Sequence, residues 1–339
     1  MLQQVMTAPG VIEFREIPIP TPKEGEILLK MERIGVCGSD IHVYHGKHPF
    51  TSYPVTQGHE VSATVFETGP GVQGFHKGQL VTVEPQLTCG ACHPCRNGKY
   101  NVCENLRVMG FQSTGLASEY FAVSAEKVTA LPETLTSDEG AMIEPLAVAV
   151  HAVRRLGPTT PEDIIVIGAG PIGNLTAQTA LGMGAKRVAI TDISDIRLQY
   201  AKDCGIPYCV NTRDSDFDSA MNEIFGADKA DAIFDCAGNN RTIGQAVSYA
   251  RKGSTIILVA VFAEIAQVDL GVLNDHELDL NTSMMYRHDD YVEAIRLASE
   301  GKVRLSPLIS VHFPFQDYLS AYEFIDKNRE TTMKVIIDI

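Results

Sequence analysis

The stretch that decides the fold is Asp163-Ile-Ile-Val-Ile-Gly-Ala-Gly-Pro-Ile-Gly173. Its first five residues have the length and apolar character of a buried strand, and a Gly-x-Gly-x-x-Gly turn leads from them into a helical pattern that continues through Ala185. The next predicted strand is Arg187–Asp192, so an acidic residue stands 19 residues after Gly173. This order of strand, glycine turn, helix and acidic residue is typical of a dinucleotide-binding unit.

Each feature of this turn fits a role in binding a dinucleotide. Glycines let the backbone approach a pyrophosphate at the helix N-terminus, where free N–H groups favour anions. Asp192 would accept hydrogen bonds from ribose hydroxyls and repel a 2′-phosphate, so the sequence favours NAD over NADP. Arg197 could contact the adenosine end, although a solvated surface arginine would look the same. A glycine turn in another kind of α/β protein is the alternative. The candidate cofactor contacts are Gly168, Gly170, Pro171, Ile172, Gly173, Asp192 and Arg197.

Two kinds of sequence pattern lie on either side of this turn. Residues 1 to about 130 contain short β-type runs separated by glycines and prolines, which predicts a β-barrel-like domain. A helical pattern over Leu135–Arg155, starting at Thr136 or Ser137, precedes the glycine turn. Strands and helices then alternate, which predicts a parallel sheet covered on both faces. The later expected strands are Ala232–Cys236, Thr255–Val261 and Leu278–Met285; the last stretch has helices at Tyr291–Glu300 and Leu319–Lys327 and a strand, Met333–Ile337, that could pair with the first domain.

Length and charge limit the functional classes. A chain of 339 residues fits two domains, and its net charge of −14, with no block of basic residues, disfavours nucleic acid as a partner. The opening residues lack the pattern of a secretory signal, and apolar runs such as Ile256–Phe262 are too short to cross a bilayer. We therefore expect a cytoplasmic protein with no membrane partner. There the eight cysteines would stay reduced, so a tight cluster of them indicates metal binding.

Four cysteines form such a cluster. Cys89, Cys92 and Cys95 are spaced three apart, and Cys103 follows in the same loop-like stretch. Four thiolates with no open position are typical of a structural zinc. An iron–sulfur cluster uses the same ligands and is a minor alternative, and four unrelated buried thiols are another.

A second candidate metal site is spread along the chain. Catalytic zinc uses three protein ligands and leaves one position open, and Cys37, His59 and a carboxylate would supply such a set. Nearby, His42, His45 and His48 form an H-x2-H-x2-H run. Gly46 and Pro49 favour a loop there, so the three imidazoles need not share a face, and we favour plain loop histidines over a further metal site.

Together these motifs, in this order, resemble the zinc-containing medium-chain dehydrogenase/reductase family over essentially the whole chain. The resemblance is carried by Val36–Asp40, Gly58-His59-Glu60, the four-cysteine lobe, Ser118-Glu119-Tyr120, Glu144-Pro145 and the nucleotide turn. One departure is Ala63, where the family pattern has glycine. The resemblance implies an α/β fold: a GroES-like β-barrel catalytic domain at residues 1–150 and 289–339, with its structural zinc lobe at about 86–106, and a Rossmann domain, a doubly wound parallel sheet that binds NAD, at 151–288.

The resemblance also implies roles for single residues. Classical alcohol dehydrogenases have cysteine at the position of Glu144. A glutamate there resembles the sorbitol (polyol) and threonine dehydrogenase branch. By position, the ligands of the catalytic zinc would be Cys37, His59 and Glu60, with Glu144 bound directly or through the zinc-held water. Ser39 would begin a proton relay and His42 would end it. Each chain would hold two zinc ions, one catalytic and one structural.

The substrate is the least determined part. The Pro49–Pro54 and His151–Arg155 segments are most similar to bacterial sugar-acid oxidoreductases that act on hexonates such as L-galactonate or L-gulonate. Arg287 is the candidate counter-charge for an anionic substrate, although it could equally serve the cofactor, and Phe111 is a second candidate substrate contact. A polyol such as sorbitol or iditol, a polyol phosphate and threonine are alternatives. The family also leads us to expect a homodimer or homotetramer.

Two further readings belong to other functional classes. A non-catalytic NAD- or zinc-responsive binding protein could use the same fold, but a binding module would not need an open zinc position. A zinc-free quinone reductase is the second, and metal analysis would distinguish it.

Overall fold

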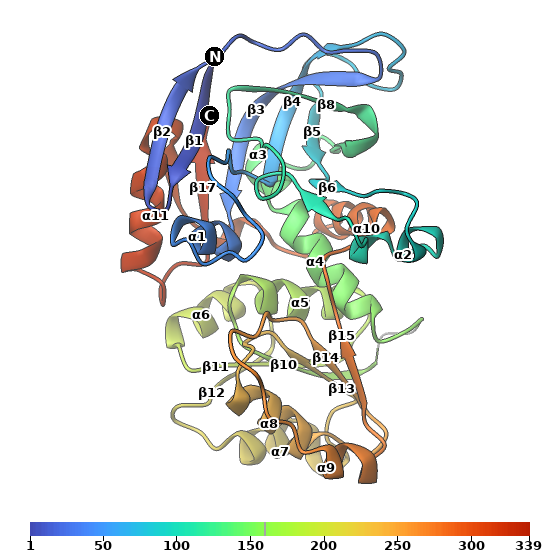
Figure 1. Cartoon of the computed structure of the whole chain (residues 1–339). Helices are drawn as coiled ribbons and strands as arrows, with labels where there is room; N and C mark the ends of the chain where they lie inside the picture. The colour runs from blue at the N-terminus through green and yellow to red at the C-terminus, as the bar shows by residue number, and fades with distance from the viewer. Residues whose placement is uncertain (159–160) are drawn as a thin grey trace. The chain divides into compact units, whose positions relative to one another are not determined.

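The computed structural model describes residues 1–158 and 161–339. The chain forms two compact units, one of Met1–Glu144 with Ile309–Ile339 and one of Pro145–Leu308 (Figure 1). Residues 145–150 and 289–308 therefore lie in the second unit, whereas the sequence prediction placed them in the first. The physical reason is packing: His151 Nδ1 lies 2.6 Å from Asp290 Oδ2, and Leu297 packs beside Gly182.

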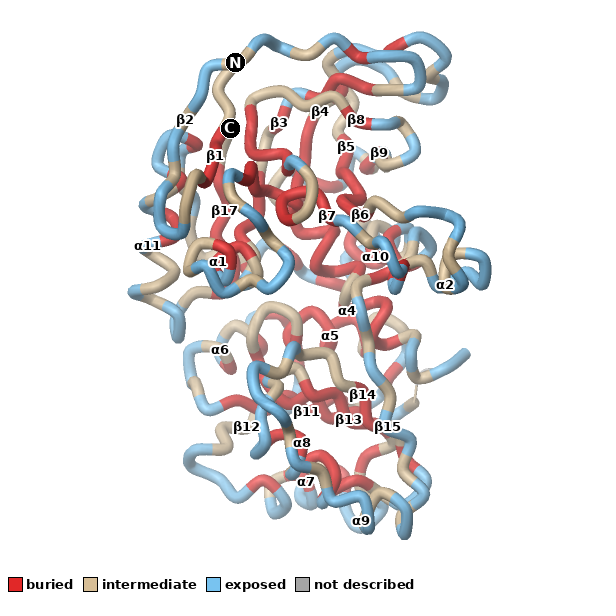
Figure 2. The backbone as a smooth tube through the Cα atoms, in the orientation of Figure 1, coloured by how far each residue is buried: buried red, intermediate tan, exposed pale blue. Residues whose placement is uncertain are grey.

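The second unit is built on a parallel sheet. Among the described residues its strand order is β12-β11-β10-β13-β14-β15, with β10 at the point where the order reverses. The strands are β10 (Asp163–Ile167), β11 (Arg187–Asp192), β12 (Tyr208–Asn211), β13 (Ala232–Asp235), β14 (Thr255–Leu258) and β15 (Asp279–Thr282). Figure 2 shows that the central strands are buried. This confirms the predicted parallel sheet and adds β12, a short and half-buried edge strand that the sequence analysis missed.

Helices cover both faces of this sheet. In Figure 1, α5 and α6 lie on one side, and α7, α8 and α9 lie on the other. Two separate apolar cores match this arrangement, one containing Ala177 and Leu198 and the other Met221 and Ile243. The helices are α4 (Ile143–Arg154), α5 (Pro171–Gly182), α6 (Asp195–Asp203), α7 (Phe217–Phe225), α8 (Asn240–Tyr249), α9 (Leu270–Asp275) and α10 (His288–Ser299). The doubly wound architecture is thus confirmed.

The first unit is mainly antiparallel. Within the described residues, one sheet has the order β16-β17-β3-β4-β5-β9, with β8 paired to β3 as well, and β1–β2 and β6–β7 form small separate sheets. The strands are β1 (Leu2–Ala8), β2 (Val11–Glu16), β3 (Glu26–Val36), β4 (Glu60–Thr68), β5 (Leu80–Val83), β6 (Gln86–Leu87), β7 (Arg107–Val108), β8 (Tyr120–Ser124), β9 (Val128–Ala130), β16 (Ile309–Pro314) and β17 (Lys334–Asp338). The closing strand does return to this unit, because β17 pairs with β3.

Short helices complete the first unit. They are α1 (Gly38–Tyr44), α2 (His93–Arg96), α3 (Ser137–Ala141) and α11 (Tyr318–Lys327). The predicted start at Thr136 is confirmed, since its hydroxyl caps α3 by accepting a hydrogen bond from the Glu139 N–H. The helical pattern over Leu135–Arg155 divides into α3 and α4 at Met142. In the described part of the chain, no helix is long and apolar enough to cross a membrane.

Candidate active site and metal centres

The four-cysteine lobe lies between β6 and β7. The sulfur atoms of Cys89, Cys92, Cys95 and Cys103 all lie within 4.8 Å of one another, with Cys103 Sγ 3.5 Å from Cys89 Sγ. The backbone N–H groups of Ala91 and Cys92 lower the pKa of the Cys89 thiol to about 6. Amides that stabilise a thiolate in this way suit a thiolate metal ligand. The set therefore fits a tetrahedral zinc with all four positions filled.

The second cluster forms where β3 meets β4. Cys37 follows β3 and caps the N-terminus of α1, while Glu60 opens β4 and pairs in the sheet with Gly35. Ligand atoms of Cys37, His59 and Glu60 lie within 4.8 Å of one another. Gly35 leaves room for the Glu60 carboxylate, because a Cβ at Gly35 would stand 2.4 Å from Glu60 Oε2 and would displace it. The antiparallel register thus brings Cys37 beside His59 and Glu60, which follow it more than 20 positions later in the chain.

A buried polar network holds this cluster. The Cys37 backbone N–H donates to Asp40 Oδ2 (2.9 Å), and Gln57 Nε2 donates to Asp40 Oδ1 (3.2 Å). The Tyr322 hydroxyl donates to Gln57 Oε1 (2.9 Å). His59 Nδ1 lies 3.4 Å from Asp40 Oδ1. Burial lowers the pKa of His59, but Asp40 and Cys37 act more strongly together and raise it well above its ordinary value. Second-layer partners of this kind orient metal ligands.

Buried charge at the cluster indicates a cation. The carboxylates of Asp40, Glu60 and Glu144 and the thiol of Cys37 are gathered around the imidazole of His59 and the ammonium of Lys334. Unpaired buried charge is costly, so this excess of acidic groups among the described residues favours a further positive charge. A thiolate, an imidazole and a carboxylate are the ligand types that zinc prefers, so the residues fit a catalytic zinc.

The two candidate carboxylates differ in position. Glu60 belongs to the cluster, and its Oε2 accepts a hydrogen bond from Lys334 Nζ at 2.5 Å. Glu144, the second residue of α4, is buried but lies outside the group of atoms within 4.8 Å. Burial lowers the pKa of Lys334, and the charges of Glu60, Cys37 and Glu144 outweigh burial and raise it. The geometry therefore groups Glu60, rather than Glu144, with Cys37 and His59.

The predicted relay residues lie on one short helix. Ser39 and His42 stand three positions apart on α1, which places them on the same face, and His42 is exposed. The histidine run is partly helical rather than all loop, and its members point to different partners. His45 Nε2 contacts Asp326 at 3.0 Å, and His48 Nδ1 contacts the Thr51 hydroxyl at 2.7 Å.

The glycine turn has the backbone that the sequence predicts. Gly170 caps α5, which begins at Pro171 and continues through Ile172. A Cβ at Gly173 would stand 1.8 Å from the Gly168 carbonyl oxygen, so only glycine fits there. Asp192 ends β11, and its Oδ2 accepts a hydrogen bond from the Ala169 N–H at 2.8 Å. Asp192 thus shapes the turn itself; Arg197 Nη1 lies 3.9 Å from its Oδ2.

The two candidate substrate residues have different surroundings. Arg287 Nη2 lies 3.6 Å from Asp289 Oδ2 and its Nε lies 3.9 Å from Asp290 Oδ2, so carboxylates already compensate its charge. The Phe111 ring packs against the His59 ring, with centroids 4.9 Å apart, and stacks on His48 at 4.8 Å. Phe111 therefore lies directly beside the metal-binding cluster.

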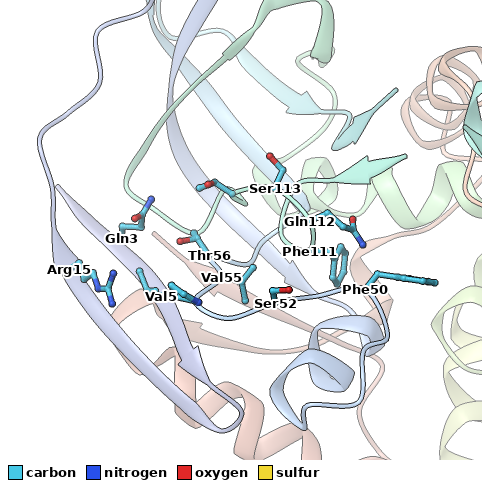
Figure 3. A pocket seen from close by; sticks show the side chains of 12 residues that line it. Gln3, Val5, Arg15, Phe50, Ser52, Val55, Thr56, Phe111, Gln112 and Ser113 are labelled. Atoms are coloured by element: carbon cyan, nitrogen blue, oxygen red, sulfur yellow. The ribbon is translucent and has the colours of Figure 1, made fainter. Parts of the chain in front are cut away.

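Phe111 also lines a groove of the first unit. The groove measures about 590 Å³, which is within the usual range for small-ligand sites. Figure 3 shows Phe50 and Phe111 at one end and Gln3 and Arg15 at the other. Between them the lining is largely polar and consists of Val5, Ser52, Pro54, Val55, Thr56, Gln112, Ser113 and Thr114. A groove that joins an aromatic end to a cationic end suits an extended, hydroxylated and anionic molecule.

Comparison with known proteins identifies the family. Residues 23–133 match the alcohol dehydrogenase GroES-like domain, and residues 171–300 match the zinc-binding dehydrogenase domain. The chain is 34% identical, over 94% of its length and 92% of the relative's, to 2-dehydro-3-deoxy-L-galactonate 5-dehydrogenase from Pseudoalteromonas atlantica. The chain belongs to the zinc-containing medium-chain dehydrogenases.

Two further relatives add detail about this dehydrogenase family. A sorbitol dehydrogenase from Halalkalibacterium halodurans is 33% identical, with 93% of each chain covered. The crystal structure of a short chain alcohol dehydrogenase from Escherichia coli CFT073, complexed with NADH, is 30% identical with a TM-score of 0.92, and covers 100% of this chain and 99% of that one. The predicted fold class, enzyme class and family are confirmed. The chain is a zinc-dependent dehydrogenase of the polyol and sugar-acid branch that uses a nicotinamide cofactor.

Sequence reasoning missed several residues of this dehydrogenase's polar network. Asp40 belongs to a predicted motif but has no predicted role, and Gln57, Tyr322 and Lys334 lie outside every predicted site. The spacing of Asp40 three residues after Cys37 could have indicated a capping box around the cysteine. Tyr322 and Lys334 reach the site only through the pairing of distant strands and helices, and no local pattern marks them.

Proposed function

We propose that this dehydrogenase oxidises a secondary hydroxyl of a hexonate sugar acid to the corresponding keto acid, with NAD as the hydride acceptor. The observation that carries the proposal is the cluster of half-buried Cys37 with buried His59 and Glu60, together with its excess of acidic groups. Bound zinc would supply a Lewis acid that lowers the pKa of the substrate hydroxyl, and bound NAD would accept the hydride.

The chain's own residues would hold these groups. Cys37, His59 and Glu60 would bind the catalytic zinc, and Glu144 would act from just outside this set. The four cysteines of the lobe would bind a structural zinc, which gives two zinc ions per chain. The backbone of residues 168–173 would receive the pyrophosphate, and Asp192 would receive the ribose. The relative complexed with NADH supports NAD as the cofactor.

Ser39 and His42 would move the proton that leaves the hydroxyl. They share one face of α1, directly after Cys37, and His42 is exposed to solvent. An imidazole titrates near neutral pH, so His42 suits the last step, in which the proton passes to water.

The groove supports an anionic substrate. Phe111 is its aromatic end beside His59, and Arg15 is its cationic end. The Arg15 Nη2 lies 3.8 Å from Glu13 Oε2 and about half of its side chain is exposed, so it could bind a carboxylate. Arg15 is favoured over Arg287 because Arg15 lines this groove and Arg287 is not part of its lining. The relative named for a deoxygalactonate points the same way; the relative named for sorbitol favours a neutral polyol as the second candidate.

The test is a substrate screen with purified, zinc-loaded protein. Reduction of NAD is followed with L-galactonate, L-gulonate, sorbitol, iditol, a polyol phosphate and threonine. We expect the highest kcat/KM for a hexonate. A preference for sorbitol or threonine would replace the substrate assignment, whereas no turnover with any of them at two zinc ions per chain would favour a non-catalytic binding protein.

A further inference from the structure

Among the described residues of the first unit, Lys334 is the most buried cation near the cluster of Cys37, His59 and Glu60. It opens β17, with only 3% of its surface exposed, and its Nζ donates to Glu60 Oε2 at 2.5 Å and to the Val36 carbonyl oxygen at 3.3 Å. Glu60 is itself only 1% exposed. In a buried ion pair, removal of one partner leaves the other charge uncompensated. Loss of either partner therefore destabilises the protein much more than loss of a surface salt bridge does.

The sheet fixes this contact. β17 pairs with β3 so that Val335 stands opposite Val36, which places Lys334 beside the end of β3 where Cys37 begins α1. On the other side of β3, Gly35 stands opposite Glu60 and leaves the space that the carboxylate fills. The ammonium and the proposed zinc therefore approach the same carboxylate from fixed positions.

The two cations have the same counter-charges. Glu60 bonds Lys334 directly, and the negative charges of Cys37 and Glu144 act on the same ammonium. Zinc would bind Cys37 and Glu60 as well, and two cations that share counter-charges weaken each other's binding by equal amounts. A Glu60 whose charge is partly used by Lys334 is a weaker, more easily released ligand than one whose charge is free.

We propose that Lys334 is a positioning residue that competes with the catalytic zinc for the Glu60 carboxylate and keeps that carboxylate exchangeable. The inference rests on the proposed function only in that zinc occupies the cluster of Cys37, His59 and Glu60. Its consequence is that removal of the ammonium leaves Glu60 free to hold zinc more tightly. A lysine that merely supports the fold would have no such effect.

The experiment measures zinc release rather than turnover. Zinc-loaded wild-type protein and Lys334→Met are mixed with excess EDTA, and zinc loss is followed with time. Cys37→Ser identifies which release phase belongs to the catalytic site, since that phase should be missing there. We expect this phase to be about tenfold slower in Lys334→Met, a size typical of changes behind a metal ligand. Lys334→Arg, which keeps the charge, should release zinc as the wild type does.

Two controls separate competition from a loss of structure. Lys30→Met removes an exposed lysine of β3, whose partner Glu32 lies 3.8 Å away, and should leave release unchanged. Zinc-free Lys334→Met should be less stable than zinc-free wild type, because Glu60 is left unpaired, and added zinc should reduce this difference. If Lys334→Met does not fold, Lys334→Gln removes the charge but retains a polar donor, and it should also slow release.

The outcomes are distinct. Release from Lys334→Met or Lys334→Gln that is equal to or faster than the wild type overturns the competition. A wild-type protein that shows no Cys37-dependent release phase, although it binds zinc elsewhere, overturns the proposed catalytic zinc instead. Cobalt substitution gives a second readout, since the visible spectrum of Co²⁺ at this site should change in Lys334→Met and not in Lys30→Met.

Discussion

The cysteine lobe and the catalytic cluster are two metal sites built in opposite ways. The lobe takes all its ligands from residues 89–103, between two short strands, and Cys89 is exposed. The cluster takes its ligands from the ends of β3 and β4 and its supporting groups from α1, α11 and β17, and most of these are buried. A local, closed site holds a loop in shape, whereas a dispersed site with surrounding charges can tune a reaction.

The sharpest test of this comparison is to remove one cysteine from each site. Cys37→Ser should reduce kcat by at least ~10³-fold, because the several kcal/mol contributed by a Lewis acid would be lost, while the thermal unfolding midpoint changes little. Cys103→Ser should show the reverse, with lower stability and near-normal kcat in the folded fraction. Activity assays, circular dichroism and zinc analysis measure this.

Cys209→Ser is the matched control, since Cys209 lies in neither metal-binding group of the described residues. It should change neither kcat nor zinc content. If Cys37→Ser unfolds while Cys103→Ser keeps full activity, the comparison holds for the lobe only. If Cys103→Ser is stable but inactive, the two sites have the opposite roles.

The lobe should also reveal itself by its thiol chemistry when zinc is removed. The pKa of Cys89 is lowered to about 6 by backbone N–H groups, and the pKa of Cys95 is raised to about 12 by burial. Since the thiolate is the nucleophile, alkylation of Cys89 by iodoacetamide should rise with pH through about 6 and then level off. At pH 6 the rate should exceed that of Cys95 about a hundredfold or more, measured by mass spectrometry. A midpoint near the ordinary thiol value of about 8.5 would show that the metal-free lobe loses this backbone.

The groove lined by Phe111 and Arg15 should bind part of the substrate beside the catalytic cluster. Arg15→Gln should raise KM for a hexonate about tenfold, the size expected for one hydrogen-bonded charge pair, and leave KM for sorbitol unchanged. Arg107→Gln, an exposed arginine of the same unit outside the groove lining, is the control. Equal effects of Arg15→Gln on hexonate and sorbitol would remove Arg15 from substrate recognition.

The smallest expected effect concerns Asp192, in which structural and chemical roles coincide. Asp192→Ala should reduce the preference for NAD over NADP about fivefold and also weaken both cofactors, because the Ala169 N–H loses its acceptor. Asp192→Asn keeps an acceptor and should lose only the preference. Kinetics with both cofactors measure this, and an unchanged ratio in both variants would remove Asp192 from cofactor selection.

Local patterns predicted much of this molecule. The run 163–173 predicted β10, the glycine turn and α5, and the cysteine spacing predicted the lobe, because all the determining residues are neighbours in the chain. The start of α3 at Thr136 was also correct, since a capping box needs only four residues. These features follow from short-range chemistry.

Features that depend on long-range packing were harder to predict. The boundary after residue 288 was placed too early, because α10 is held in the second unit by Asp290 and by contacts of Leu297 with a helix more than a hundred residues earlier. Edge strand β12 has too little apolar character to stand out. Lys334 was missed for the same reason as the boundary, since its partner Glu60 is 274 positions away.

The pairing of β17 with β3 has a consequence for biosynthesis. During translation β3 and β4 emerge early, but residues 334–338 emerge almost 300 positions after the end of β3. Until then Glu60 does not have the Lys334 ammonium beside it. The buried ion pair between Lys334 and Glu60 can therefore form only after nearly the whole chain has been synthesised.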